Sequence, residues 1–390
     1  MLSTYFADMH IHIGRDIYNQ PVKITASKNL TIQAILEESS RNKGIHLIGV
    51  IDCQSPAVQQ EITQLIETNK AMELEDGGIR FESVTLILGS EIEIYDEHCH
   101  GPIHVLCYLP TLAQMQAFSE WLCKRMKNIT LSSQRYYGSG IELQRKVKEL
   151  GGVFIPAHVF TPFKSLYGKG VYNTLKEVFD PRFIDGIELG LSSDSQMADQ
   201  IQELHDFTYL SNSDSHSLSK IAREYQEISM EFPSFREFYL ALHRLKGRQV
   251  TRNYGMNPRL GKYHTTVCST CFNKVTSKST TCPFCGDTKI IKGVVNRIDE
   301  LKDIKNSYDS RKNRPPYVYQ VPLEYLPKLG KKTYEKLLRN FGTEMNVIHH
   351  APLEELKKVI PEQVASSIVE MRNGKQRIET GGGGRYGFIK

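Results

Sequence analysis

The chain has 390 residues, of which 40% are hydrophobic and 24% are charged. This length exceeds one ordinary hydrophobic core, so we expect two or three globular domains. No run of about eighteen or more apolar residues occurs, which excludes a membrane-spanning helix. The first residues lead into a strand-like segment without a basic and apolar leader, which favours a cytoplasmic location. The eight Cys are therefore interpreted as metal ligands or buried thiols.

Net charge is unevenly distributed along the chain. Residues 1–250 contain 24 Lys and Arg against 31 Asp and Glu, a balance of −7, whereas residues 251–390 contain 25 against 13, a balance of +12. The second part is either a solvated basic tail or a phosphate-binding module joined to a metal-binding body. The asymmetry favours the module.

Short apolar runs alternate with helical periodicity through the first 250 residues. The runs are 4–10, 46–52, 84–94, 103–108, 152–158, 184–189, 207–211 and 225–232. The helical patterns are 32–42, 57–69, 112–126, 141–150 and 196–205. Such alternation predicts a parallel α/β fold, and this number of strands fits a barrel better than an open sheet. The two adjacent runs within 84–108 predict a local hairpin.

The remaining residues change in composition. Residues 247–261 have little periodicity, 264–290 carry two pairs of Cys, and 302–314 are polar and charged. Short helices are predicted at 323–327, 331–341 and 353–372, before a Gly-rich end at 381–390. We therefore expect a catalytic barrel at 1–250, a four-cysteine zinc module with basic flanks at 251–300, a linker at 301–321, and a helical region with a Gly-rich tail at 322–390.

His and acidic residues recur at or near the ends of the predicted strands. In a parallel barrel these ends open on one face, so residues far apart in sequence converge on one pocket. Three or more imidazoles mixed with carboxylates suit Zn, Mn or Fe better than Mg alone. A bridging carboxylate would hold two metals as in phosphoester hydrolysis. The candidate ligands are His10, His12, Asp52, Glu91, His104, His158, Asp214 and His216.

Asp214 is the carboxylate best placed to orient a metal-activated water or to bridge metals, and we predict it as the catalytic residue. Two or three divalent metals, Zn, Mn or Mg, are expected in the barrel. Glu93 alternates in step with Glu91 and could also face the pocket.

Five motifs in chain order resemble those of the polymerase-and-histidinol-phosphatase (PHP) superfamily. The motifs are Asp8-Met9-His10-Ile11-His12, Gly89-Ser90-Glu91-Ile92-Glu93, Ile103-His104-Val105-Leu106, Pro156-Ala157-His158 and Ser213-Asp214-Ser215-His216. The resemblance implies a distorted seven-stranded β/α barrel with two or three metals that hydrolyses phosphoesters. One position departs, because Ile51-Asp52-Cys53 stands where that superfamily usually has Thr-Asp-His. Either Cys53 ligates a softer metal at this position, or Asp52 replaces the usual His as the metal ligand.

Two Cys-x-x-Cys pairs form a four-thiolate zinc pattern of the ribbon or knuckle kind. The four residues are Cys268, Cys271, Cys282 and Cys285. Four thiolates make a closed, tetrahedral and therefore structural site. One structural Zn is predicted, whose role is to fold a segment too short to build its own core.

Basic residues interleaved with Tyr254 and Tyr263 flank the zinc pattern, and such surfaces suit phosphate contacts with base stacking. Residues 322–338 resemble a helix-hairpin-helix element, in which Gly330 and Lys331 would present backbone N–H groups to a DNA phosphate. Lys328 stands where that motif usually has its first Gly. The alternative is a small helical bundle that docks on the body.

The order of barrel, zinc pattern and hairpin-like helices, together with Ile51-Asp52-Cys53 and residues 158–170, resembles the endonuclease Q family over nearly the whole chain. That resemblance implies a DNA repair endonuclease that cleaves 5′ of deaminated bases (hypoxanthine, uracil, xanthine) and abasic sites. The loop after His158 adjoins the metal face, so it is expected to hold a flipped nucleotide; the candidates are Phe160, Phe163, Lys164, Tyr167 and Lys169. Packing of the barrel rim is the alternative role for each ring.

Three other functions are alternatives to a DNA repair endonuclease. A small-molecule phosphoesterase of the histidinol-phosphatase kind would need neither a zinc module nor a basic tail. A 3′-5′ exonuclease of the PHP type shares the metal chemistry but needs a strand end. A non-catalytic DNA-binding scaffold is disfavoured by intact ligands at most strand ends. The expected partner is damaged DNA, and no membrane contact is expected. A sliding clamp is a further candidate partner, but no segment is assigned as its binding motif.

Overall fold

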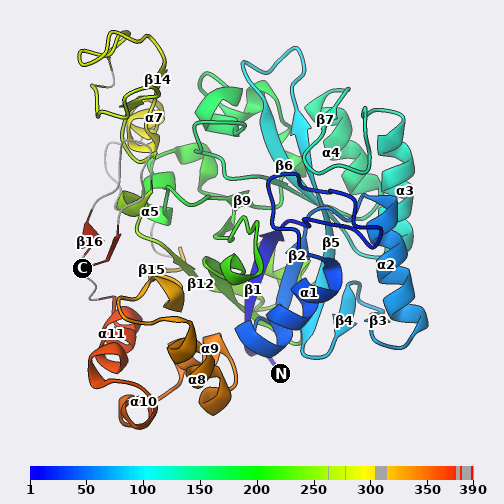
Figure 1. The fold of residues 1–390 in the computed structure, drawn as a ribbon. Coiled ribbons are helices and arrows are strands. Elements are labelled where there is room, and N and C mark those ends of the chain that lie inside the picture. The colour runs from blue at the N-terminus through cyan, green and yellow to red at the C-terminus, as the bar shows by residue number, and fades with distance from the viewer. Residues whose placement is uncertain (262, 277, 304–313, 375–377, 380–387, 390) are drawn as a thin grey trace.

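The computed structural model describes residues 1–261, 263–276, 278–303, 314–374, 378–379 and 388–389. Its centre is a run of buried strands wrapped by helices (Figure 1). These strands are β1 (Ser3–Ile11), β2 (Leu47–Val50), β5 (Val84–Ile94), β6 (Ile103–Leu109), β8 (Val153–Pro156), β9 (Ile187–Glu188) and β10 (Tyr209–Leu210).

The strands are joined into a distorted barrel. β1, β2 and β5 pair in parallel, whereas β6 runs antiparallel to both β5 and β8. The N–H of Asp185 donates to the carbonyl of Phe154 at 3.0 Å and links β8 to the parallel pair β9–β10. A bridge between Ile11 and Ser215 returns the chain to β1. The α/β class and the hairpin predicted within 84–108 are confirmed.

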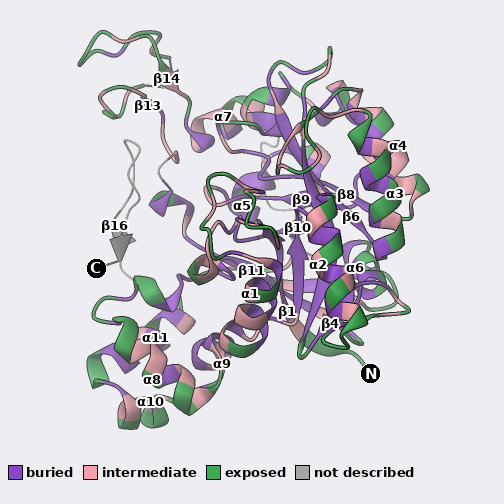
Figure 2. Cartoon of the chain, turned by 45° about the vertical axis from the view of Figure 1, so that its right-hand side comes forward, coloured by how far each residue is buried: buried purple, intermediate pink, exposed green. Residues whose placement is uncertain are grey.

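Helices cover the outside of these strands. Figure 2 shows their outer faces exposed and the strands beneath them buried. The helices are α1 (Ile32–Glu37), α2 (Pro56–Glu67), α3 (Leu112–Cys123), α4 (Gly140–Glu149), α5 (Ser195–Ala198) and α6 (Phe235–Leu242). In α4 the Ser139 hydroxyl accepts the Glu142 N–H at 3.1 Å, while Leu143 and Val147 are buried on one face. The pattern predicted at 196–205 yields only α5 and a 3-10 turn, Gln202–Leu204.

The barrel sheet continues beyond residue 225. β11 (Tyr225–Met230) pairs with β1, β12 (Gln249–Gly255) pairs with β11, and β15 (Tyr317–Tyr319) pairs in parallel with β12. The boundary expected at residue 250 therefore lies inside β12, and the segment expected as a linker contains β15. Smaller strands border the other edge: β3 (Met72–Glu73), β4 (Ile79–Phe81) and β7 (Arg135–Tyr136).

The Cys-bearing segment protrudes from one side of the barrel. It contains β13 (Val267–Cys268) and β14 (Ile290–Ile291), an antiparallel pair, and then α7 (Val294–Leu301). The guanidinium of Arg297 donates to the carbonyls of Tyr167, Val171 and Tyr172 at 2.8, 3.0 and 2.7 Å. These bonds anchor α7 to the loop that follows β8.

Four helices form the C-terminal region: α8 (Lys331–Phe341), α9 (Glu344–His349), α10 (Leu353–Val359) and α11 (Glu362–Arg372). The helix predicted at 353–372 divides at Pro361, which lacks the N–H that a continuous helix needs. A buried ion pair of 2.6 Å joins Lys43 of the barrel to Glu344 of α9. Beyond α11, β16 (Ile378–Glu379) pairs with β17 (Phe388–Ile389). Residues 304–313 of the expected linker and Gly381–Gly384 of the expected tail lie outside the described residues.

Within the described ranges, no helix has the length and apolar character needed to traverse a lipid bilayer. The zinc-pattern segment and the C-terminal helices lie on the same side of the barrel, one towards each end of it (Figures 1 and 2).

His349 fixes the C-terminal helices to the barrel sheet. Its ring stacks on Phe6 with centroids 4.6 Å apart, and its Nε2 lies 2.7 Å from the hydroxyl of Tyr225. Burial, reinforced by neighbouring cationic groups, lowers the pKa of His349 to about 3. The folded protein therefore holds a neutral imidazole, whereas the unfolded chain takes up a proton below an ordinary pKa of about 6.5. Stability from this group is present above that pH and is lost as pH falls towards 3.

We expect a His349→Gln variant to lose less stability on acidification than the native chain. Between pH 6.5 and pH 5 the neutral imidazole should cost the native chain up to about 2 kcal/mol, because each pH unit costs about 1.4 kcal/mol. Urea unfolding at both pH values, followed by helical circular dichroism, measures this difference. An exposed histidine outside this contact offers the control, His98→Gln. Equal pH dependence in the two variants would exclude this role for His349.

Candidate metal centre

The end of β1 places His10 and His12 on the same face of the strand, because side chains alternate along it. Both imidazoles are buried. Asp8, two residues earlier, does not touch either ring. Its carboxylate accepts the N–H groups of Ser213 at 3.0 Å and Ala222 at 2.8 Å. Asp8 therefore fastens the loop that carries Asp214 to β1.

His10, His12 and Asp214 form the first candidate group. Oδ1 of Asp214 lies 3.5 Å from Nε2 of His10 and 3.4 Å from Nε2 of His12. Asp214 has a positive φ of 46°, which is uncommon for a residue other than glycine and marks strain at a functional position. Its side chain is 33% exposed, whereas the two imidazoles are buried. The group therefore opens towards solvent through Asp214.

Glu91, His104 and His158 form the second candidate group. Oε1 of Glu91 lies 2.9 Å from Nδ1 of His104 and 3.3 Å from Nε2 of His158. The same oxygen is 3.6 Å from Nε2 of His10. Glu91 therefore lies between the two groups, which suits a carboxylate that bridges two metals. In each group one ligand atom from every residue lies within 4.8 Å of the others.

Two further carboxylates lie behind the imidazoles. Glu188 of β9 contacts Nδ1 of His10 at 2.8 Å, and Asp52 contacts Nδ1 of His12 at 3.2 Å. Such contacts orient a metal-binding imidazole and leave its other nitrogen free. Asp52 therefore orients His12 and does not belong to either group, although it was expected as a ligand. Glu188 was absent from the predicted ligand set; its position as a carboxylate inside the apolar run 184–189 was the available signal.

The position of His158 depends on Gly190. His158 has a positive φ of 32°, and a Cβ added to Gly190 would lie 2.7 Å from the Cβ of His158. A larger residue at position 190 would displace this imidazole, because real Cβ atoms do not approach so closely.

His216 and Cys53 stand apart from the two groups. Nδ1 of His216 lies 3.7 Å from Oδ1 of Asp214, and its ring packs against that of His12 at 4.6 Å. His216 thus borders the first group, with 35% of its side chain exposed. The Cys53 thiol donates to the carbonyl of Val50 at 3.1 Å, and burial raises its pKa to about 12. A thiolate ligand at this position is not supported.

The donor set fits divalent metals. Among the described residues, four buried imidazole nitrogens of the two ligand groups have no hydrogen-bond partner: Nε2 of His10, His12 and His104, and Nδ1 of His158. Buried polar atoms ordinarily find partners, so these nitrogens mark places for a ligand. Burial disfavours charge on His10, but Glu188, Asp214 and Glu91 outweigh it and raise the pKa of His10 to about 10. Metal binding at this imidazole therefore displaces a proton.

Cys268, Cys271, Cys282 and Cys285 come together as predicted from their spacing. The sulfur atoms of Cys268 and Cys285 are 3.6 Å apart, and those of Cys271 and Cys282 are 3.5 Å apart. Four sulfurs tetrahedrally arranged around zinc stand about 3.8 Å from one another. The cluster therefore has the dimensions of a four-thiolate zinc site.

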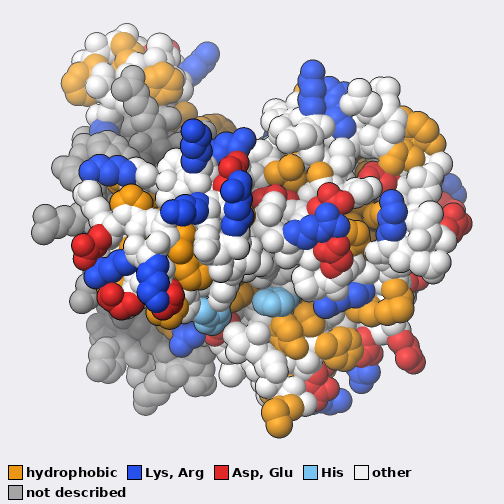
Figure 3. Space-filling view, turned by 60° about the horizontal axis from the view of Figure 1, so that its bottom comes forward, with side chains coloured by type: hydrophobic (Ala, Val, Ile, Leu, Met, Phe, Trp, Pro, Cys, Tyr) orange, Lys and Arg blue, Asp and Glu red, His pale blue; other side chains and the backbone are white. Residues whose placement is uncertain are grey.

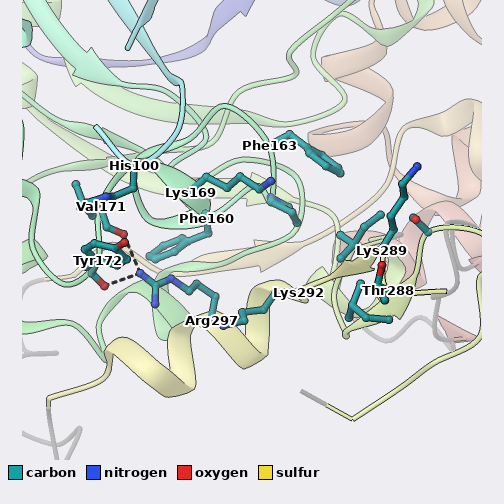
Figure 4. A pocket seen from close by; sticks show the side chains of 15 residues that line it. His100, Phe160, Phe163, Lys169, Val171, Tyr172, Thr288, Lys289, Lys292 and Arg297 are labelled. Carbon is teal, nitrogen blue, oxygen red and sulfur yellow. Dashed lines mark hydrogen bonds between the residues drawn. The ribbon is translucent and has the colours of Figure 1, made fainter. Parts of the chain in front are cut away.

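A cavity of about 700 Å³ separates the loop after β8 from the zinc-pattern segment (Figure 4). Its rim includes Phe163, which is 42% exposed, and Lys169. The structure corrects the expectation for Tyr167, whose ring is fully buried and whose hydroxyl donates to Glu203 at 2.7 Å. Phe160 stacks on this ring and is only 1% exposed, although its edge lines the cavity. Both rings pack the barrel rim.

The hairpin-like turn precedes α8. Gly330 caps this helix, and Gly330 and Lys331 are exposed. Lys328 has a positive φ of 66°, so it adopts the left-handed conformation that glycine usually supplies in such a turn. On the face shown in Figure 3, Lys and Arg side chains alternate with Asp and Glu and form no uniform basic field.

Comparisons with known proteins extend over the whole chain. A family model described as the MJ0043 C-terminal domain matches residues 328–375. An uncharacterized protein, YqxK of Bacillus subtilis (strain 168), is 52% identical over 385 residues, or 99% of each chain. The crystal structure of the lesion-specific endonuclease PfuEndoQ from Pyrococcus furiosus is 34% identical with a TM-score of 0.85, covering 100% of this chain and 95% of that one.

A crystal structure of endonuclease Q with a 27-mer duplex substrate, which carries an abasic lesion at the active site, also has a TM-score of 0.85 and 34% identity. It covers 100% of this chain and 96% of that chain. Fold and site together define an α/β barrel protein with a histidine- and carboxylate-lined metal centre. With these matches, the chain belongs to the endonuclease Q family.

Proposed function

We propose that this protein is a metal-dependent DNA repair endonuclease that hydrolyses the phosphodiester 5′ of deaminated bases and abasic sites in DNA. The observation that carries the proposal is the pair of adjacent ligand groups joined by Glu91, on a chain that matches endonuclease Q over its full length. The abasic lesion at the active site of endonuclease Q supports this substrate class. Hypoxanthine, uracil and xanthine come from the family resemblance.

In this proposal His10, His12 and Asp214 hold one divalent metal, Zn, Mn or Mg, and Glu91, His104 and His158 hold a second. When bound, such metals lower the pKa of a water towards neutrality and neutralise charge on the phosphate. Glu188 and Asp52 fix the orientation of the imidazoles at β1, as their 2.8 and 3.2 Å contacts indicate. Because His216 lies at the border of the first ligand group, it remains available to a third metal.

Asp214 is proposed as the catalytic residue. Burial favours its protonated form, but His10, His12 and His216 outweigh this and hold the pKa of Asp214 well below its usual range. Its carboxylate is therefore ionised at neutral pH and can bind a metal or orient a water. The side chain is partly exposed, in contrast to the buried imidazoles behind it.

Substrate contacts are proposed on both sides of the metal centre. Phe163 and Lys169 offer an accessible ring and a cation beside the cavity, and Lys164 pairs with Glu93 at 2.9 Å. Aromatic rings with cations suit bases and phosphates of an unstacked strand. Gly330 and Lys331, at the N-terminus of α8, are proposed to contact a phosphate further along the duplex. The four Cys are proposed to bind one structural Zn.

The test is incubation of the protein with Mn²⁺ or Mg²⁺ and a duplex containing one internal deoxyinosine, uracil or abasic site. We expect a single nick 5′ of the lesion, mapped by denaturing electrophoresis with either end labelled. A matched duplex without the lesion should remain intact. A ladder shortened from the 3′ end would instead identify an exonuclease, and phosphate release from a small phosphomonoester without any nick would overturn the proposal.

A further inference from the structure

Lys23 lies at the metal centre without belonging to either ligand group. It comes from the segment between β1 and α1, which begins with the ligand His12. Its Nζ is 3.3 Å from Oε2 of Glu91 and 2.6 Å from the hydroxyl of Ser133. The Ser133 hydroxyl also donates to the same Glu91 oxygen. The ammonium therefore contacts Oε2 of Glu91, whereas His104 and His158 contact Oε1.

The backbone around Lys23 is fixed on both sides. The Lys23 N–H donates to the carbonyl of Ile13 at 2.8 Å, and the Ser132 N–H donates to the carbonyl of Val22 at 2.9 Å. The N–H of Ser27 donates to the carbonyl of His216 at 2.8 Å. The segment is thus tied both to the end of β1 and to the loop that carries Asp214. Such anchoring places the ammonium in a defined position before any substrate arrives.

Exposure indicates where the substrate enters. The side chains of Glu91, His10 and His12 are almost completely buried. In contrast, the side chain of Lys23 is 17% exposed and that of Asp214 is 33% exposed. A substrate phosphate must approach through the groups that remain open. Two of the three N–H groups of the ammonium donate to Glu91 and Ser133, so the third is available to a substrate oxygen.

We propose that Lys23 binds a non-bridging oxygen of the scissile phosphate beside the two ligand groups, and this inference rests on the proposed endonuclease function. Held by Glu91 and Ser133, the ammonium needs no rearrangement to meet the charge that develops on the phosphate. Preorganised donors of this kind contribute roughly 10²–10³-fold to rate when they stabilise developing charge. Lys164, which pairs with Glu93 on the same face of β5, is a second cation across the site.

The test compares Lys23→Met, Lys23→Arg and the wild type in single-turnover cleavage of a lesion duplex. Lys28→Met, an exposed lysine of the same segment, is the control. Rates at several protein concentrations give the maximal rate and the half-saturating protein concentration. The half-saturating concentration is then measured again at several salt concentrations. The metal content of each purified protein is measured by mass spectrometry.

We expect Lys23→Met to lower the maximal rate roughly 10²-fold with unchanged metal content. Its half-saturating concentration should depend less steeply on salt, by roughly 0.9 in logarithmic slope, because one phosphate contact is lost. Lys23→Arg should recover most of the rate, and Lys28→Met should match the wild type.

A normal rate in Lys23→Met, or a loss of metal with an unchanged salt slope, would overturn the phosphate contact. The second result would mean that Lys23 only balances the charge of Glu91. Failure of the wild type to cleave any lesion would instead overturn the proposed function and this inference with it. Folding is checked by comparing the thermal unfolding of the variants, and Lys23→Arg keeps the test decisive if Lys23→Met is unstable.

Discussion

Asp214→Asn is expected to reduce cleavage of a lesion duplex by roughly 10³-fold or more while leaving salt-dependent DNA binding close to normal. The amide keeps the size of the carboxylate but removes its charge, and Asp214 lies 3.5 and 3.4 Å from the imidazoles of His10 and His12. In the proposed function, metal binding and water orientation both depend on that charge. Single-turnover cleavage and fluorescence anisotropy with the same duplex measure the two effects separately.

Asp206→Asn serves as the matched control, because Asp206 is exposed and lies outside the metal centre. It should cleave at the native rate. Cleavage by Asp214→Asn within about tenfold of the wild type would contradict the catalytic assignment. A parallel loss of DNA binding would indicate that the loop from 213 to 222 is disrupted, since Asp8 holds that loop to β1.

Cys268→Ser is expected to remove one zinc per chain and to unfold the segment around residues 264–291. Structural zinc provides much of the folding free energy of such segments, about 10–16 kcal/mol in small zinc-binding peptides. The segment has little apolar core of its own beyond β13 and β14. DNA affinity should fall roughly tenfold, because ordered cations beside the cavity are lost.

Hydrogen exchange with mass spectrometry and elemental zinc analysis check this prediction. Protection should disappear in the zinc-pattern segment and persist in β1, β5 and β6. Cys123→Ser is the control, since Cys123 is an exposed thiol on a distant helix. Full zinc content and unchanged protection in Cys268→Ser would exclude the four-thiolate site.

The sequence was sufficient for the parts of the fold with strong periodicity. β5 and β6 are long apolar runs joined by residues 95–102, and their hairpin followed directly. Helix α8 begins at Lys331 and ends at Phe341, as its pattern predicted. Most candidate ligands lie at or near strand ends, so the barrel brings six of the eight into the two groups, whereas Asp52 and His216 lie beside them.

Other features depend on tertiary contacts that periodicity does not encode. β9 and β10 have two residues each, so nothing local determines that Glu188 turns towards His10. β2 ends at Val50, which leaves Asp52 on a turn that points back to His12. β12 is rich in polar residues and joins the sheet because β11 and β15 supply its hydrogen-bond partners. Burial of Tyr167 likewise follows from packing around Arg297 and Glu203.

The pairing of β15 with β12 has a topological consequence. The chain leaves the barrel sheet after β12, passes through the Cys-bearing segment, and returns to the same sheet at β15 before the C-terminal helices begin. The segment is therefore an insertion closed at both ends. A single protease cut within it would leave two fragments that stay associated, because each retains strands or helices packed on the barrel. Because both ends of the segment are attached to the same sheet, at β12 and β15, the distance that the segment can move towards bound DNA is limited.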